Sequence, residues 1–225
     1  MRSVIFVFAL LVSWVPRLAA YPVYEGSLSS GGLNATSSWN TKTSFSWDVS
    51  YDEISDAWIY NYHLSVNKKT IQYVYLETSS TFSEENILEG TSDFIKLGMF
   101  GEEENQPDTL FGIEFAPQKK KTEYTFTIVT DRAPAWGDFY AIGQKTGKAW
   151  NTVSNSGFKS PDTDPLALLY PADDGSVFGH ILIPGDEDTD SIIGGEEAII
   201  VPEPATFLLL IAAALCIAAG RIKHS

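Results

Sequence analysis

The sequence is poor in residues on which several common kinds of site depend. Its 225 residues include one cysteine, three histidines and two methionines. Cys216 lies in an apolar run near the C-terminus, so the rest of the chain has no disulfide and must be held by its hydrophobic core. His63 and His180 each stand alone in the sequence, and no Gly-x-Ser-x-Gly or paired metal-binding His motif occurs. We therefore predict a protein that is not an enzyme and has no metal or other cofactor.

Basic residues are also scarce. The chain has 15 Lys and Arg against 29 Asp and Glu, and the segment 21–204 contains all 29 acidic residues but only eleven basic ones, a formal net charge of −18. Such a charge disfavours nucleic acid and anionic membrane surfaces as partners. A pair of carboxylates that hydrolyses glycosides stays open as an alternative, because the fold, and not the sequence, sets its spacing.

The N-terminus predicts a secretory signal peptide over residues 1–20. Arg2 precedes an apolar run over residues 4–12, which Pro16 follows, and Ala20 is a small residue suited to cleavage before Tyr21. The run is about 9 residues long, too short to span a bilayer as a helix. We expect residues 21–183 to form one exported domain and 184–200 an acidic, polar tether. Within the tether Asp186, Asp188 and Asp190 alternate, but no glycine stands at the sixth position of a calcium loop, so a solvated linker is favoured.

The C-terminus combines three features in a fixed order over residues 201–225. Val201 is followed by Pro202, Glu203 and Pro204, whose two prolines favour an extended and accessible backbone. Residues 205–220 form an apolar run of about 16 residues, roughly 24 Å as a helix, which is slightly short for a hydrocarbon core of about 30 Å. Arg221 and Lys223 then hold the end on the cytoplasmic side. We expect a single transmembrane helix with the preceding chain outside.

This order of Pro-Glu-Pro, apolar helix and short basic tail resembles the PEP-CTERM sorting signal of Gram-negative bacteria. The resemblance implies recognition by an integral-membrane exosortase, which would cut near Pro202–Pro204 of a precursor anchored in the inner membrane. The mature protein would then reach the cell surface or the extracellular matrix. Proteins of this family commonly accompany exopolysaccharide or biofilm production, so exopolysaccharide is a further implied partner. The alternative is an ordinary C-terminal anchor that no enzyme processes.

Between the two targeting segments the pattern is that of β-strands. Apolar residues alternate at Phe45, Trp47 and Val49, then at every second residue from Trp58 to Val66, and again at Tyr124, Phe126 and Ile128. We expect a central strand over 71–76, because both of its faces are apolar, and a hairpin turn at 67–69 before it. Further strands are predicted over 94–100, 109–115 and 177–183, with a short helical turn over 83–90. Recurrent short strands without a long amphipathic helix predict an all-β, antiparallel sandwich, jelly-roll-like or immunoglobulin-like, with a barrel as the alternative.

The least generic segment of the domain is Asp131–Ala141. It resembles a segment of an uncharacterised group of PEP-CTERM proteins, in which Arg-Ala-Pro precedes Trp-Gly-Asp-Phe-Tyr and a glycine-rich turn, here expected at Gly143–Gly147. That resemblance carries no known activity. Five tryptophans of the domain could form a sugar-stacking platform, but those on alternating strands are better explained by core packing. Trp136, Asp138 and Tyr140 are the candidate ligand-binding residues.

These observations favour a structural surface or matrix protein. A glycan-binding module that acts in the exopolysaccharide is the second hypothesis, and a hydrolase of that polymer is the third.

Overall fold

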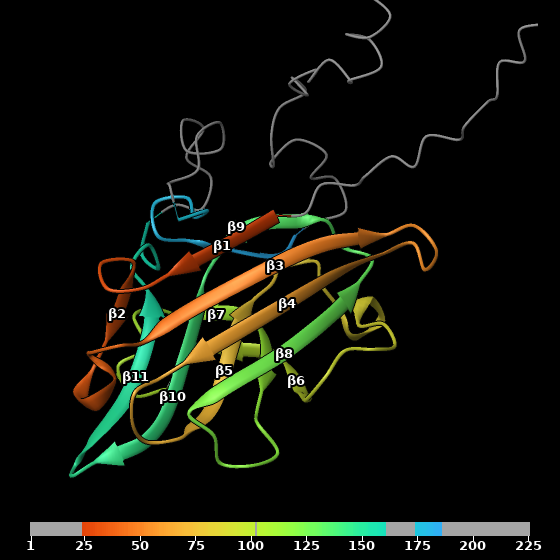
Figure 1. Cartoon of the computed structure of the whole chain (residues 1–225). Helices are drawn as coiled ribbons and strands as arrows, with labels where there is room; N and C mark the ends of the chain where they lie inside the picture. The colour runs from red at the N-terminus through yellow and green to blue at the C-terminus, as the bar shows by residue number, and fades with distance from the viewer. Residues whose placement is uncertain (1–23, 102, 161–173, 186–225) are drawn as a thin grey trace, which may run out of the picture.

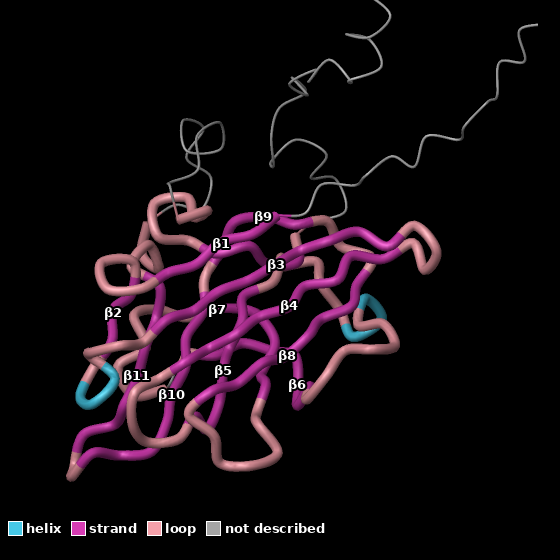
Figure 2. The backbone as a smooth tube through the Cα atoms, in the orientation of Figure 1, coloured by secondary structure: helices cyan, strands magenta, loops and turns pink. Residues whose placement is uncertain are grey.

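The computed structural model describes residues 24–101, 103–160 and 174–185. These residues form antiparallel sheets of four and six strands packed on one another, together with a two-stranded ribbon (Figure 1). The predicted all-β class is confirmed, and the arrangement is consistent with a β-sandwich. The only helical elements in this part of the chain are two 3₁₀ turns, η1 (Ser37–Trp39) and η2 (Glu84–Asn86), which Figure 2 shows in cyan.

The four-stranded sheet has the order β1-β3-β4-β8. Its strands are β1 (Tyr24–Leu28), β3 (Ser44–Asp52), β4 (Ala57–Ser65) and β8 (Glu123–Thr130). Phe45, Trp47 and Val49 of β3 are buried, as predicted, and the residues between them point to the opposite face. The period of two in the sequence therefore separates an apolar inner face from a polar outer one.

The six-stranded sheet has the order β2-β11-β10-β5-β7-β6. Its strands are β2 (Leu33–Ala35), β11 (Ala149–Asn155), β10 (Phe139–Thr146), β5 (Ile71–Glu77), β7 (Leu110–Phe115) and β6 (Phe94–Phe100). As predicted, β5 is central, and it pairs with β10 on one side and β7 on the other. Its side chains are buried on both faces, since Val74 and Leu76 enter the core between the sheets while Tyr75 packs on the outer side.

The core between the sheets is rich in aromatic rings. Phe45 of β3 and Phe139 of β10 stack with centroids 3.9 Å apart and so join the two sheets, and both are fully buried. An aromatic side chain buries about 150–250 Å². At about 25 cal/mol per Å² each such ring stabilises the fold by several kcal/mol, an upper estimate because the unfolded chain already buries some of this area. The core therefore holds the domain without a disulfide in the described residues.

The ribbon pairs β9 (Pro134–Gly137) with β12 (Ile181–Pro184). Its last contact is a hydrogen bond of 2.8 Å from the backbone N–H of Gly185 to the carbonyl of Ala133. The predicted strand over 177–183 is thus shorter, because Phe178 has φ +44° and Gly179 φ +79°, and these left-handed residues interrupt an extended backbone. Pro184 belongs to the folded domain and not to the predicted tether.

The predicted hairpin at 67–69 is wrong. β4 and β5 lie in different sheets, and the connection between them crosses from one sheet to the other. The segment that leads into β8 holds both ends of this crossing, since the N–H of Val66 donates to Thr122 and that of Ile71 to Lys121, each at 2.9 Å. Two consecutive strands separated by a polar turn look the same in sequence whether they pair or not.

Other local predictions are confirmed or refined. The helical turn predicted over 83–90 is η2, where Ser83 and Asn86 form a capping box. The glycine-rich turn is confined to Gly147, with φ +63°, because Gly143 lies inside β10. A Cβ at Gly143 would lie 2.2 Å from the Trp39 ring and 2.5 Å from the carbonyl oxygen of Thr70, so only glycine fits there.

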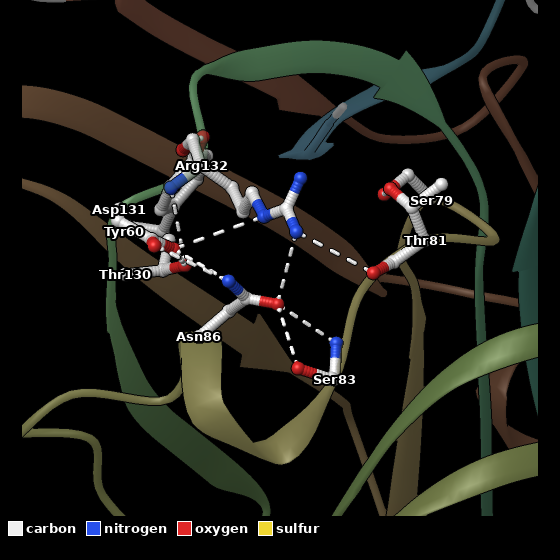
Figure 3. Close-up of polar contacts among 8 residues, drawn as sticks. All are labelled: Tyr60, Ser79, Thr81, Ser83, Asn86, Thr130, Asp131 and Arg132. Carbon is white, nitrogen blue, oxygen red and sulfur yellow. Dashed lines mark hydrogen bonds and ion pairs between the residues drawn. The ribbon is translucent and has the colours of Figure 1, made fainter. Parts of the chain in front are cut away.

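The buried side chain of Arg132 ties η2 to the junction between β8 and β9 (Figure 3). Its Nη2 atom donates to Asn86 Oδ1 at 3.2 Å, and Nε lies 3.8 Å from an oxygen of Asp131. Asn86 Nδ2 in turn donates to Asp131 at 3.0 Å. Tyr60 also contacts this group, since its hydroxyl donates a hydrogen bond of 2.8 Å to the Arg132 carbonyl. The carboxylate of Asp131 is half-exposed, whereas the guanidinium of Arg132 is buried. These contacts give the buried guanidinium polar and charged partners, which explains how the fold accommodates an arginine here.

Both predicted targeting segments lie outside the described residues. This applies to the signal peptide over 1–20, to the tether from residue 186 and to the sorting signal over 201–225 with its helix at 205–220. Within the described residues, no helix has the length and apolar character needed to cross a membrane.

Candidate functional site

The three residues proposed for ligand binding are all buried. Trp136 of β9, Asp138 at the β9–β10 junction and Tyr140 of β10 are 8%, 5% and 1% exposed. They also lie in different surroundings, because Trp136 belongs to the core between the sheets and Tyr140 to a smaller cluster. The structure therefore does not bring them together as one open site.

The tryptophans do not form a common stacking surface. Trp39 and Trp47 are 0% and 3% exposed, and Trp47 lies in the same core cluster as Trp136. Trp58 and Trp150 are half-buried, and the ammonium group of Lys145 lies 4.5 Å from the centre of the Trp150 ring. Sugar binding through stacked rings needs an exposed ring face. The burial of these tryptophans favours core packing, as expected for those on alternating strands.

Tyr140 belongs to an aromatic cluster on the outer side of the six-stranded sheet. Its ring stacks on Tyr75 with centroids 5.9 Å apart, and Phe100 lies 4.7 Å from Tyr75. The hydroxyl of Tyr140 donates to the carbonyl of Glu104, and that of Tyr75 donates to the carboxylate of Glu103 at 3.1 Å. Burial, and then the nearby Glu103 charge, raise the pKa of both tyrosines well above their ordinary value. These hydroxyls stay protonated and hold the 103–104 loop on the sheet.

Asp138 is the centre of a buried polar cluster that the sequence did not predict. One carboxylate oxygen, Oδ1, lies 2.9 Å from Nδ1 of His180 and accepts a hydrogen bond of 2.6 Å from Nδ2 of Asn155. The backbone N–H of Asp138 donates to Glu77 Oε2 at 2.8 Å, and that of Phe139 donates to Asn155 Oδ1 at 2.9 Å. Glu77 at the end of β5, Asn155 at the end of β11 and His180 just before β12 thus meet at the β9–β10 junction.

The Asp138–His180 pair has the geometry of an acid–base dyad but not its accessibility. A general base must come within about 3 Å of the proton it takes from a substrate. The His180 side chain has no exposed surface and that of Asp138 is 7% exposed. The cluster is therefore best explained as a polar clasp inside the sandwich. His180 stands alone in the sequence but has Asp138 as a partner in the fold. The sequence does not reveal this pair, because 42 residues separate the two partners and no local pattern links them.

A groove lies on the outer face of the four-stranded sheet. Figure 1 shows this sheet in front of the six-stranded one. It is an open hollow of about 900 Å³. The side chains that line it come from all four strands and from the segment before β12: Glu25, Ser27, Ser46, Asp48, Asn61, His63, Thr125 and Asp174. None of the lining residues is Lys or Arg. The size suits a small-molecule or oligosaccharide ligand.

Strand register places these side chains in two rows across the sheet. In one row Ser27, Ser46, His63 and Thr125 are successive partners, and in the next Asp48 pairs with Asn61, which pairs with Thr127. Asn61 is held from both sides, because its Nδ2 donates to Asp48 Oδ2 at 2.9 Å and its Oδ1 accepts from Thr127 at 2.8 Å. In the other row His63 Nδ1 lies 2.9 Å from Thr125 Oγ1.

Sequence reasoning missed this groove, although one signal was present. Alternation predicted that Ser46, Asp48, Asn61 and His63 point away from the core, but it did not give the register that aligns β3 with β4 and β8. Across the described residues no group of three or more His, Cys, Asp or Glu side chains is arranged to hold a metal ion.

Comparison of the chain with protein-family models, with curated proteins and with solved structures finds no match.

Proposed function

We propose that this chain is an exported cell-surface or extracellular-matrix protein that an exosortase-type enzyme sorts and processes. Its role would be structural and non-enzymatic, in association with exopolysaccharide or a biofilm. In this proposal the precursor is held in the inner membrane by one helix over 205–220, and the exported part is a jelly-roll-like or immunoglobulin-like β-sandwich.

One observation carries the proposal: Pro202-Glu203-Pro204 is followed by an apolar run and then by Arg221 and Lys223, in that order. The described strands run from Tyr24 of β1 to Pro184 of β12, ahead of this signal in the chain. Cleavage after a signal peptide and cleavage near Pro202 would therefore remove no residue of the described core.

The non-enzymatic role is supported by the buried cluster at Asp138. Its carboxylate and the imidazole of His180 form an acid–base pair whose side chains are 7% and 0% exposed, so a substrate has little access to either. Trp136 and Tyr140 are both buried, so a glycan could not reach them as the glycan-binding hypothesis expected. The groove on the outer face of the four-stranded sheet is the observation that keeps this hypothesis as a second candidate.

Intact-mass analysis of protein released from exporting cells tests the proposal. The released chain should begin at or near Tyr21 and lack residues 207–225. Released protein that retains Arg221 would contradict exosortase processing, and deletion of the exosortase gene in the same cells should leave the full C-terminus in place.

A further inference from the structure

We propose that the groove over β1, β3, β4 and β8 binds a short stretch of neutral polysaccharide, with Asp48 and Asn61 as the central contacts. This goes beyond the proposed sorting and rests on it only in that an exported matrix protein meets extracellular polysaccharide.

Asp48 and Asn61 place a hydrogen-bond acceptor and a donor side by side in the groove. Asp48 uses Oδ2 for Asn61, so its Oδ1 remains as an acceptor, and Asn61 Nδ2 has a second hydrogen to donate. An acceptor beside a donor matches two neighbouring sugar hydroxyls, since each hydroxyl both donates and accepts. A carboxylate acceptor makes hydrogen bonds roughly twice as strong as a neutral one. Ser46 and His63 in the adjacent row add a hydroxyl and a ring nitrogen.

Two polar side chains of the groove, those of Asn61 and His63, are already held in place by hydrogen bonds. Asn61 is fixed between Asp48 and Thr127 at 2.9 and 2.8 Å, and His63 is fixed by Thr125. Side chains that are already held lose little conformational entropy when a ligand arrives. All of them stand on the paired strands of a sheet and not on a loop, which keeps their spacing constant.

The negative charge of the groove lining selects the class of ligand. Glu25, Asp48 and Asp174 line the groove, and no lysine or arginine does. A polymer of uronic acids or a phosphate-bearing ligand would meet carboxylates without a cationic partner. A neutral polyhydroxylated chain has no such repulsion. Four strands at about 4.8 Å spacing span roughly 14 Å, more than one sugar ring, so the occupant is an oligosaccharide segment and not a monosaccharide.

Aromatic stacking contributes little here. Trp47 and Tyr62 belong to the lining, but their rings are buried on the core side of the sheet. The interaction therefore depends on hydrogen bonds that compete with water, and we expect weak binding at each site that becomes useful on a polymer with many repeats.

Calorimetric titration of the full-length protein in detergent tests the proposal. The probes are hexasaccharides of β-1,4-linked glucose, β-1,4-linked mannose and α-1,4-linked glucose, with a hexamer of glucuronic acid as the anionic counterpart. At least one neutral probe should bind saturably with a dissociation constant below about 1 mM. The glucuronic acid hexamer should bind at least tenfold more weakly. Absence of saturation with all three neutral probes, or tighter binding of the acidic hexamer, would overturn the proposal.

Matched variants then locate the site. Asp48→Ala with Asn61→Ala removes one carboxylate and one polar group from paired strands inside the groove, and should weaken binding by at least about tenfold. Glu123→Ala with Ser65→Ala makes the same kind of change between register partners on the same outer face but outside the groove. It should leave binding within about twofold. Ser46→Tyr fills the groove without removing a charge and should abolish binding. Equal affinity of the Asp48/Asn61 variant and the parent, with both folded by circular dichroism, would refute the assignment. None of these measurements depends on processing, so failure here leaves the mass test of sorting unaffected.

Discussion

Nδ1 of His180 lies 2.9 Å from Oδ1 of Asp138 in the interior of the sandwich. Asn155 donates to the same oxygen, so a single carboxylate joins the end of β11 and the approach to β12 to the β9–β10 junction. The ribbon of β9 and β12 contains only four pairs, too few to be stable alone. The carboxylate therefore helps to fix the last described strand to the domain.

Asp138→Ala should lower the free energy of unfolding by about 3 kcal/mol, because the buried His180 and Asn155 would each lose one hydrogen-bond partner. Urea unfolding of the full chain in detergent, followed by tryptophan fluorescence, measures this loss. Asp138→Asn keeps the size and one acceptor and should cost less. Glu89→Ala, which removes an exposed carboxylate, is the control and should change stability by no more than about 0.5 kcal/mol. A similar result for Asp138→Ala and Glu89→Ala would show that the clasp does not stabilise the fold.

Trp136→Ala should destabilise the domain by roughly 3–5 kcal/mol, because its ring is 8% exposed and packs in the core between the sheets. The melting temperature should fall by many degrees. Trp150→Ala, at a half-buried position on the outer side of the six-stranded sheet, should have a smaller effect. An unchanged melting temperature for Trp136→Ala would reverse this interpretation and reopen Trp136 as a binding residue.

Alkaline pH should destabilise the fold through its buried tyrosines. Burial raises the pKa of Tyr60 and Tyr62 well above the ordinary value, and their hydroxyls donate to the carbonyls of Arg132 and Leu182 at 2.8 Å. Above about pH 10 the unfolded chain releases these protons while the folded chain keeps them, so stability falls as pH rises. Each such tyrosine adds a slope of up to about 1.4 kcal/mol per pH unit.

Urea unfolding at several values between about pH 9 and pH 11 measures that slope. Tyr62→Phe should reduce the slope of stability against pH by up to about 1.4 kcal/mol per pH unit, the contribution of one tyrosine. The lost hydrogen bond should also cost about 1 kcal/mol of stability at neutral pH. Tyr73→Phe changes a ring that is 40% exposed and serves as the control. Because lysines titrate in the same range, the difference between the two variants is the informative quantity. Parallel slopes for the parent and Tyr62→Phe would contradict the assignment.

The sequence predicted what depends on near neighbours and missed what depends on distant pairing. The inward and outward residues of β3, β4 and β8 follow from a period of two, which each strand carries in itself. The crossing between β4 and β5 could not be distinguished from a hairpin in the sequence. Whether the two strands pair depends on their partners far away in the chain, β8 for β4 and β7 for β5.

The two polar sites illustrate the same limit. Asp48, Asn61 and Thr127 become a row only through the register of three strands, two of them more than sixty residues apart. The unusual local segment around Asp138 makes it a candidate, yet its partners His180 and Asn155 come from elsewhere in the chain. Its burial could not be predicted either, since a carboxylate is normally exposed unless distant groups satisfy it.

In the proposed sorting, the basic tail should determine how the precursor is held at the membrane. Residues 205–220 are only marginally long enough to span, and Arg221 and Lys223 are the only strong charges after Glu203. Each basic residue resists translocation, so Arg221→Gln with Lys223→Gln should loosen retention. Unprocessed precursor would then escape to the periplasm or medium, because Pro202–Pro204 would no longer be kept at the level of the protease.

The ratio of full-length to processed chain in membrane and released fractions, measured with an antibody to the exported domain, checks this expectation. Lys119→Gln with Lys120→Gln removes the same charge from an exposed loop of the domain and should behave like the parent. If the doubly neutral tail variant is anchored and processed like the parent, the tail is not a stop signal. Retention would then have to come from the hydrophobicity of residues 207–219 alone, and a variant that shortens this run should lose it.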